Sequence, residues 1–247
     1  MKWRQLLFGI LANLILWQLA AWLIHRSILP GPAVVLTTFA REVVAGELGR
    51  HLAVSVVRVL ASIAVALALA VPAGLALGQS PRLNRLLSPL IYIAYPVPKV
   101  VLLPVFLLLL GIGNASKIAL IALILFFQVL VVVRDQASAI QPELVLSVRS
   151  LGAGRRALLR FVYVPASVPA MLTALRLSIG TAVAVLFLAE SFATTSGLGY
   201  YIMIESWGRV AYPEMYAGVV ALSLLGLTLY YVADWLEHRL APWLFVE

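Results

Sequence analysis

The sequence is poor in charge and contains no cysteine. Only 11% of its 247 residues are Asp, Glu, Lys or Arg, against about 25% in an ordinary soluble domain. The absence of cysteine excludes disulfides, thiolate chemistry and cysteine-based metal sites. The three histidines, His25, His51 and His238, are scattered and form no zinc-binding motif.

Motifs for covalent chemistry are also missing. No phosphate-binding loop of the type G-x-x-x-x-G-K-S/T occurs, so we do not expect this chain to bind or hydrolyse ATP by itself. No pair of carboxylates lies within an apolar stretch, so the spans contain no candidate acid–base pair for a membrane enzyme. We therefore predict a protein that is not an enzyme and holds no cofactor or metal of its own.

Apolar side chains are abundant, at 63% of the residues, and a lipid bilayer accepts such a surface. Six stretches approach the roughly 20 residues that a membrane-spanning helix needs. They are about Leu6–Ile24, Val54–Gly78, Leu86–Leu110, Ile118–Val133, Ala166–Ala189 and Met215–Leu236. We predict an all-α integral membrane protein with six transmembrane helices and one domain over residues 1–247.

Two of these stretches and one segment between them have special features. The first stretch resembles a signal peptide but exceeds the usual 7–15 apolar residues, so we interpret it as a retained helix. The third contains Pro96, Pro98 and Pro104 and should be kinked or broken. Between the first two spans, Val35, Phe39 and Val43 recur at four-residue spacing, which predicts a short amphipathic helix.

The basic residues predict the orientation. With the N-terminus inside, 10 of the 18 Lys and Arg residues fall in cytoplasmic regions, 5 in outer regions and 3 within spans. This bias favours cytoplasmic placement of both termini, and it explains the formal charge of +8 without a nucleic acid partner.

Residues 137–164 are too polar to span and too patterned to be a slack loop. Pro142 and Glu143 suit the first turn of a helix. Gly152 and Gly154 can end that helix in a sharp turn, and a second short helix with basic residues follows. We call residues 137–164 the elbow and predict that it is a helix–turn–helix presented to the cytoplasm.

The elbow resembles the signature loop of ABC importer permeases, written EAA, three residues, Gly, nine residues, I-x-L-P. Gly152 fits the glycine, and Val162, Val164 and Pro165 fit the end of the motif conservatively. The EAA positions are not matched, since they hold Leu146, Ser147 and Val148.

Further segments are similar to permeases of the nitrate, sulfonate and taurine group. They are LPGPAVV at Leu29–Val35, SVVRVLASI at Ser55–Ile63, PAGLALG at Pro72–Gly78, YPVPKVVLLPVFLLLLGIG ending at Gly113, PELVLSVRSLGAG, LRLSIGTA, AESF and SGLGYYI at Ser196–Ile202. The resemblance implies a type I importer permease fold with a core region of about residues 51–237. It also implies alternating access in a bacterial inner membrane.

The resemblance further implies partners. A second permease copy would complete the pathway as a homodimer, and a dimer of ATP-binding subunits would bind ATP and Mg²⁺ and dock on the elbow. A periplasmic or lipid-anchored binding protein would deliver the substrate. The coupling residues carried over to this chain are Glu143, Leu146, Ser147, Val148, Leu151, Gly152, Ala153, Arg155 and Pro165.

Charges within the spans are candidates for the pathway. Counting residues places Lys99 and Arg176 near the midplane, where they could favour a small anion such as nitrate, a sulfonate or taurine. The alternative for Arg176 is an ion pair that fixes helix packing. Glu190 could form part of a gate or contact the binding protein, or it could be a helix-end residue. Arg58 is expected to extend outward to the membrane surface.

Other functions remain as alternatives. A similar permease could import a thiamine precursor or another small organic solute. A secondary transporter driven by an ion gradient would need midplane ligands for the coupling ion and inverted repeats, and neither is visible. A membrane enzyme or an assembly scaffold is the remaining alternative.

Overall fold

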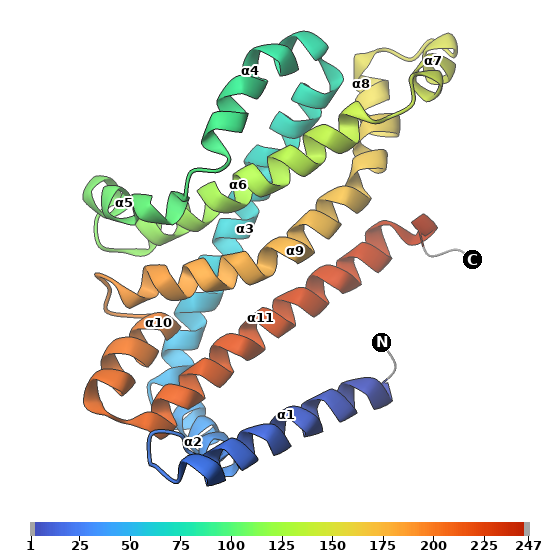
Figure 1. Cartoon of the computed structure of the whole chain (residues 1–247). Coiled ribbons are helices and arrows are strands. Elements are labelled where there is room, and N and C mark those ends of the chain that lie inside the picture. The colour runs from blue at the N-terminus through green and yellow to red at the C-terminus, as the bar shows by residue number, and fades with distance from the viewer. Residues whose placement is uncertain (1–2, 245–247) are drawn as a thin grey trace. The chain divides into compact units, whose positions relative to one another are not determined.

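The computed structural model describes residues 3–244, and every regular element in that range is helical. The α-helices are α1 Trp3–Ile24, α2 Pro32–Val44, α3 Leu48–Gln79, α4 Pro81–Ala94, α5 Leu103–Leu110, α6 Asn114–Ser138, α7 Pro142–Ser150, α8 Arg155–Leu158, α9 Val164–Ser191, α10 Leu198–Tyr200 and α11 Tyr212–Leu240 (Figure 1). Short 3-10 or π-helical turns cover Lys99–Leu102, Leu159–Tyr163, Tyr201–Ser206, Trp207–Arg209 and Pro242–Leu244.

Five of the helical segments are long and apolar enough to cross a membrane. They are Leu7–Ile24, Leu48–Gln79, Asn114–Ser138, Arg155–Ser191 and Tyr212–Leu240. A sixth crossing exists if the bent pair Pro81–Ala94 and Lys99–Leu110, which meet at 81°, counts as one span. The predicted break in the third stretch is therefore confirmed, and it falls at the Tyr95–Pro98 segment.

The predicted boundaries were too short for most spans. Helix α3 begins at Leu48 rather than Val54, and α6 covers 25 residues rather than the 16 of Ile118–Val133. Hydropathy detects only the apolar part of a helix, whereas Lys117 and Arg134 extend α6 with side chains that are themselves buried. The amphipathic helix between the first two spans is confirmed as α2, with Val35 fully buried.

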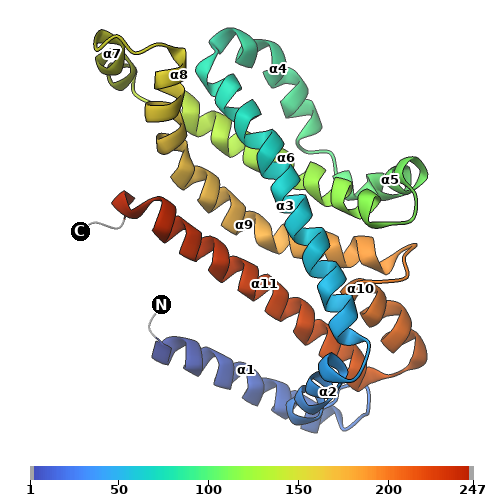
Figure 2. The same cartoon turned by 180° about the vertical axis from the view of Figure 1, so that it is seen from behind.

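The chain forms two compact units, each described here by itself. Of the described residues, the first contains 3–56 and 187–224, and the second contains 57–186 and 225–244. The first unit holds α1, α2, α10 and the adjoining ends of α3, α9 and α11. The second holds α4 to α8 and the remaining parts of those three helices (Figure 2).

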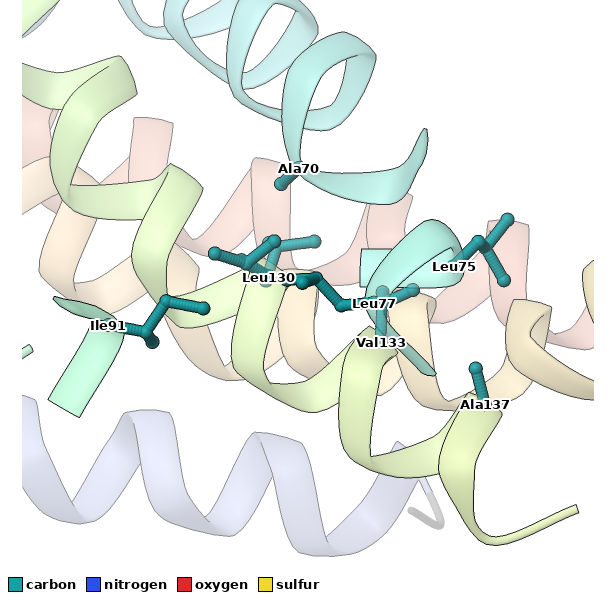
Figure 3. Close-up of a cluster of buried hydrophobic side chains, with 8 residues drawn as sticks. Ala70, Leu75, Leu77, Ile91, Leu130, Val133 and Ala137 are labelled. Atoms are coloured by element: carbon teal, nitrogen blue, oxygen red, sulfur yellow. The ribbon is translucent and has the colours of Figure 1, made fainter. Parts of the chain in front are cut away.

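The core of the second unit lies where α3, α4 and α6 meet. Its buried side chains are Ala70, Leu75, Leu77, Ile91, Val129, Leu130, Val133 and Ala137 (Figure 3). Helices α3 and α6 approach each other closely at Gly74 and Gly78, because a Cβ atom there would lie 2.9 Å from the Val133 Cβ and 2.5 Å from the Ala137 Cβ. This is the small-residue packing that lets membrane helices touch backbone to backbone.

Candidate functional site

The elbow has the predicted helix–turn–helix form. Helix α7 begins at Pro142 with Glu143 in its first turn and Arg149 in its last. It ends in a turn at Gly152, whose φ of +84° is one that side chains with a Cβ rarely adopt. The Gly152 N–H donates to the Arg149 carbonyl at 2.9 Å. Helix α8 then leads through the π-helical turn at Leu159–Tyr163 into α9.

The elbow exposes apolar side chains. No residue of α7 is buried, and Leu151 is 87% exposed while Leu146 is 61% exposed. Among the other coupling candidates, Glu143, Ser147, Gly152 and Arg155 are exposed, and Val148, Ala153 and Pro165 are half-buried. An exposed apolar surface of this kind is typical of a surface that contacts another protein.

Lys99 lies at the break in the third span, and its ammonium group binds backbone oxygens. The Nζ atom donates to the carbonyls of Ala94, Tyr95 and Val97 at 2.8, 2.9 and 3.3 Å. It also lies 4.4 Å from the centre of the Phe127 ring. Only 9% of Lys99 is exposed, so this side chain stabilises the carboxyl end of α4, where unpaired carbonyls favour a cation.

Arg176 of α9 is paired with carboxylates of α11. Its Nη1 atom lies 2.6 Å from Asp234 Oδ1 and 2.9 Å from Glu237 Oε2. Thr173 donates to the other oxygen of Glu237 at 2.7 Å. These contacts place Arg176 level with the last two turns of α11 and favour the packing alternative. Contact of Arg176 or Lys99 with substrate stays a prediction.

Glu190 is fully buried and belongs to a group of side chains that binds one loop. We call His51, Ser55 and Glu190 the loop bracket. Three consecutive backbone N–H groups are satisfied by it: Gly197 N donates to His51 Nδ1 at 2.9 Å, Leu198 N to Ser55 Oγ at 2.8 Å and Gly199 N to Glu190 Oε2 at 3.2 Å. Ser55 Oγ in turn donates to Glu190 Oε2 at 2.7 Å.

The loop bracket fixes the start of the helical segment that follows Gly197, because the first N–H groups of a helix have no partner within it. Since Nδ1 of His51 accepts a hydrogen bond, its proton is on Nε2, which lies 3.1 Å from Glu205 Oε2. Gly197 has a φ of +110°, and a Cβ atom there would collide with the Glu190 carboxylate. Glu190 therefore helps to hold this loop, and a role in a gate or in contact with a binding protein stays a prediction.

An acidic pocket of about 380 Å³ lies in the same unit. Glu42, Glu47, Glu205 and Glu214 line it together with Tyr201 and Arg209. Burial raises the pKa of the Tyr201 phenol, and the nearby Glu42 carboxylate raises it further. Within residues 3–244, no group of three His, Asp or Glu side chains is arranged to hold a metal ion.

Sequence reasoning missed the loop bracket and misplaced Arg58. The guanidinium of Arg58 does not extend to the surface, because the residue is 2% exposed and its Nε donates to Asn114 Oδ1 at 2.8 Å. His51 and Ser55 gave no signal, since His51 lies before the predicted apolar stretch and Ser55 is a single hydroxyl at its start. Only the recurrence of polar side chains at three- or four-residue spacing, at His51, Ser55, Arg58 and Ser62, could have indicated a buried polar stripe on one helix face.

The comparisons with known proteins agree with this architecture. Residues 58–246 match the family described as "Binding-protein-dependent transport system inner membrane component". The taurine transport system permease protein TauC of Escherichia coli is 33% identical, with 98% of this chain and 94% of that protein covered. The putative aliphatic sulfonates transport permease protein SsuC of Bacillus subtilis is 29% identical, with 92% and 83% covered.

A solved structure shows the same fold. A chain of the MetNI methionine ABC transporter in an inward-facing conformation superposes with a TM-score of 0.65 at 19% identity, covering 78% of this chain and 95% of that chain. The type I importer permease fold is thereby confirmed. The chain belongs to the family of binding-protein-dependent transport system inner membrane components, and it is the permease subunit of an ABC importer.

Proposed function

We propose that this permease imports a small organic or inorganic anion, with taurine and other sulfonates as the first candidates and nitrate as the next. The observation that carries the proposal is the 33% identity to the taurine permease over 98% of the chain. The similarity to the sulfonate permease supports the same substrate class. A formylaminopyrimidine permease, ThiX of Halalkalibacterium halodurans, is 27% identical, which keeps a thiamine precursor as the second candidate.

The working assembly that we propose contains two copies of this chain in a bacterial inner membrane, with both termini in the cytoplasm. A dimer of ATP-binding subunits binds ATP and Mg²⁺, and a periplasmic or lipid-anchored binding protein supplies the substrate. In such an assembly the exposed apolar residues of α7 dock on the ATP-binding subunit. Closure of the ATPase dimer then moves the elbow as a rigid piece and drives the exchange between inward-facing and outward-facing states.

The turn at Gly152 provides a test of the elbow. Nothing lies within 4 Å of a Cβ atom placed at Gly152 or at Gly154, but only Gly152 has a positive φ. Gly152→Ala should therefore strain the turn by about 1–2 kcal/mol and lower ATPase activity of the complex, whereas the matched control Gly154→Ala should not. Gly152→Asn should retain more activity, because asparagine tolerates this conformation.

The measurement is ATPase activity and co-purification of the permease with its ATP-binding subunit in lipid. Equal behaviour of the Gly152→Ala and Gly154→Ala complexes would show that the elbow turn is not the coupling element. The substrate class is tested with the same complex in vesicles loaded with ATP. Binding protein charged with taurine, an alkanesulfonate or nitrate should stimulate uptake, and stimulation by a formylaminopyrimidine alone would favour the second candidate.

A further inference from the structure

A groove of about 760 Å³ lies in the second unit, away from the apolar face of α7. Its walls come from the carboxyl end of α3, the start of α4 and the segment from α7 into the π-helical turn. The apolar wall includes Val71, Leu75, Leu83 and Leu159. The exposed apolar residues Leu146 and Leu151 do not line it, whereas the coupling candidate Arg155 does, so the groove adjoins the proposed docking surface of the elbow.

Three arginines line the same groove. Arg149, Arg155 and Arg156 make no ion pair within the described residues, and all three are exposed. Of the acidic residues described in this unit, Asp135 lies 2.8 Å from Arg134, and Asp234 and Glu237 pair with Arg176. Glu143 lines no part of the groove and forms no ion pair with the three arginines. The charge of these arginines is therefore not balanced locally, and it fits an anionic ligand.

Polarity changes along the groove in one direction. On α3 the lining residues run from Val71 and Leu75 to Gln79, a rise of about 12 Å for eight residues, and Ser80 follows before α4. The wall formed by α8 and the start of α9 shows the same change of polarity, because it is charged at Arg155 and Arg156 and apolar at Val164. The charged end is the cytoplasmic end in the orientation proposed above, on which this inference rests.

We propose that this groove binds an anionic phospholipid of the inner leaflet, with its phosphate on the three arginines and its upper acyl chain along Val71, Leu75 and Leu83. Basic pockets beside cytoplasmic helix ends are suited to such head groups. A free anion would leave the apolar walls exposed to water, and a lipid without net charge would leave the guanidinium groups unbalanced. Because the arginines belong to the elbow and the apolar wall to α3 and α4, the lipid would connect these elements.

The test is native mass spectrometry of the permease in complex with its ATP-binding subunit, incubated with phosphatidylglycerol or with phosphatidylcholine of the same chain length. We expect selective retention of phosphatidylglycerol by the unaltered complex. The double variant Arg149→Gln/Arg156→Gln should retain about tenfold less, because it loses charge-assisted hydrogen bonds to the phosphate. Arg82→Gln/Arg85→Gln is the matched control, since both residues are exposed on α4 but do not line the groove.

A second variant tests the apolar half. Ala76 is exposed and lines the groove. The Phe side chain in Ala76→Phe should occupy the apolar part of the groove and reduce retention of phosphatidylglycerol, although all arginines are intact. Equal loss in the two double variants would overturn the proposal, since it would reflect general attraction of anionic lipid. Displacement by free glycerol 1-phosphate at equal concentration would also overturn it in favour of a simple anion site, as would retention only in the permease without its ATP-binding subunit.

The same spectra keep this test separate from the proposed function. Failure of the permease to assemble with the ATP-binding subunit would count against the assembly, whereas an intact complex with no selectivity for phosphatidylglycerol would count against the lipid site alone.

Discussion

At the scale of single residues, the buried charges of this chain are balanced mostly by groups on its own helices. Lys99 binds three carbonyls, and Arg176 binds two carboxylates. Such pairing is what a low-dielectric environment demands, since an uncompensated charge there is costly. A cation that is already paired attracts an anion in the pathway less strongly than an unpaired cation at the same depth.

The Arg176 cluster gives the first prediction at this scale. Arg176→Gln should destabilise the permease, because Asp234 and Glu237 lose their common cation and repel each other. The neutral triple variant Arg176→Gln/Asp234→Asn/Glu237→Gln should regain thermal stability in detergent, and it should also regain substrate uptake. A triple variant that is stable but still cannot take up substrate would instead assign Arg176 to the pathway.

At the scale of helices, the third span consists of two helices joined by a break. The prolines in this stretch predict the break. The residue that stabilises the break was not predictable in that role. Lys99 was interpreted as a pathway candidate because sequence shows a charge at bilayer depth but not the carbonyls of Ala94 and Tyr95 that face it. Similarly, the elbow could be predicted from Pro142 and Gly152, which act locally. The loop bracket joins His51 to Gly197, 146 positions apart, and leaves no local signal.

Lys99→Met therefore tests the break itself. The variant keeps the length of the side chain but leaves the three carbonyls without their donor, so the angle between α4 and α5 should become variable. Spin labels on cysteines introduced at the exposed residues Leu90 and Leu108 should show a broader distance distribution, and the natural absence of cysteine removes background labelling. An unchanged distribution would mean that the prolines alone maintain the angle.

At the scale of the whole molecule, composition and hydropathy were sufficient to predict the all-α membrane fold and five of its six expected spans. They could not decide whether the bent pair of α4 and α5 crosses the membrane or returns to the same side, since both arrangements bury the same apolar residues. The charge distribution favours crossing, because crossing places the basic elbow on the same side as the N-terminus.

The topology prediction follows from counting spans. Ser27 and Thr195, both exposed, are separated by four crossings if the bent pair spans and by three if it does not. Ser27→Cys and Thr195→Cys should therefore be labelled by a membrane-impermeant maleimide from the same side of sealed vesicles, and Ser147→Cys in α7 from the other side. Labelling of the first two positions from opposite sides would contradict the six-span arrangement.

The contact at Gly74 and Gly78 has a mechanical consequence. At Gly74 and Gly78 helix α3 contributes no side chain, and only the Val133 and Ala137 side chains of α6 lie at the contact. The interface therefore holds little that can deform, and α3 and α6 should move as one rigid body over this stretch. Helix α7 of the elbow follows the end of α6 after only three residues, 139–141. A displacement of a few ångströms at the elbow would thus be carried along α3 and α6 together without being absorbed at their interface. A larger residue at either glycine would separate the two helices and let them move relative to each other at this point.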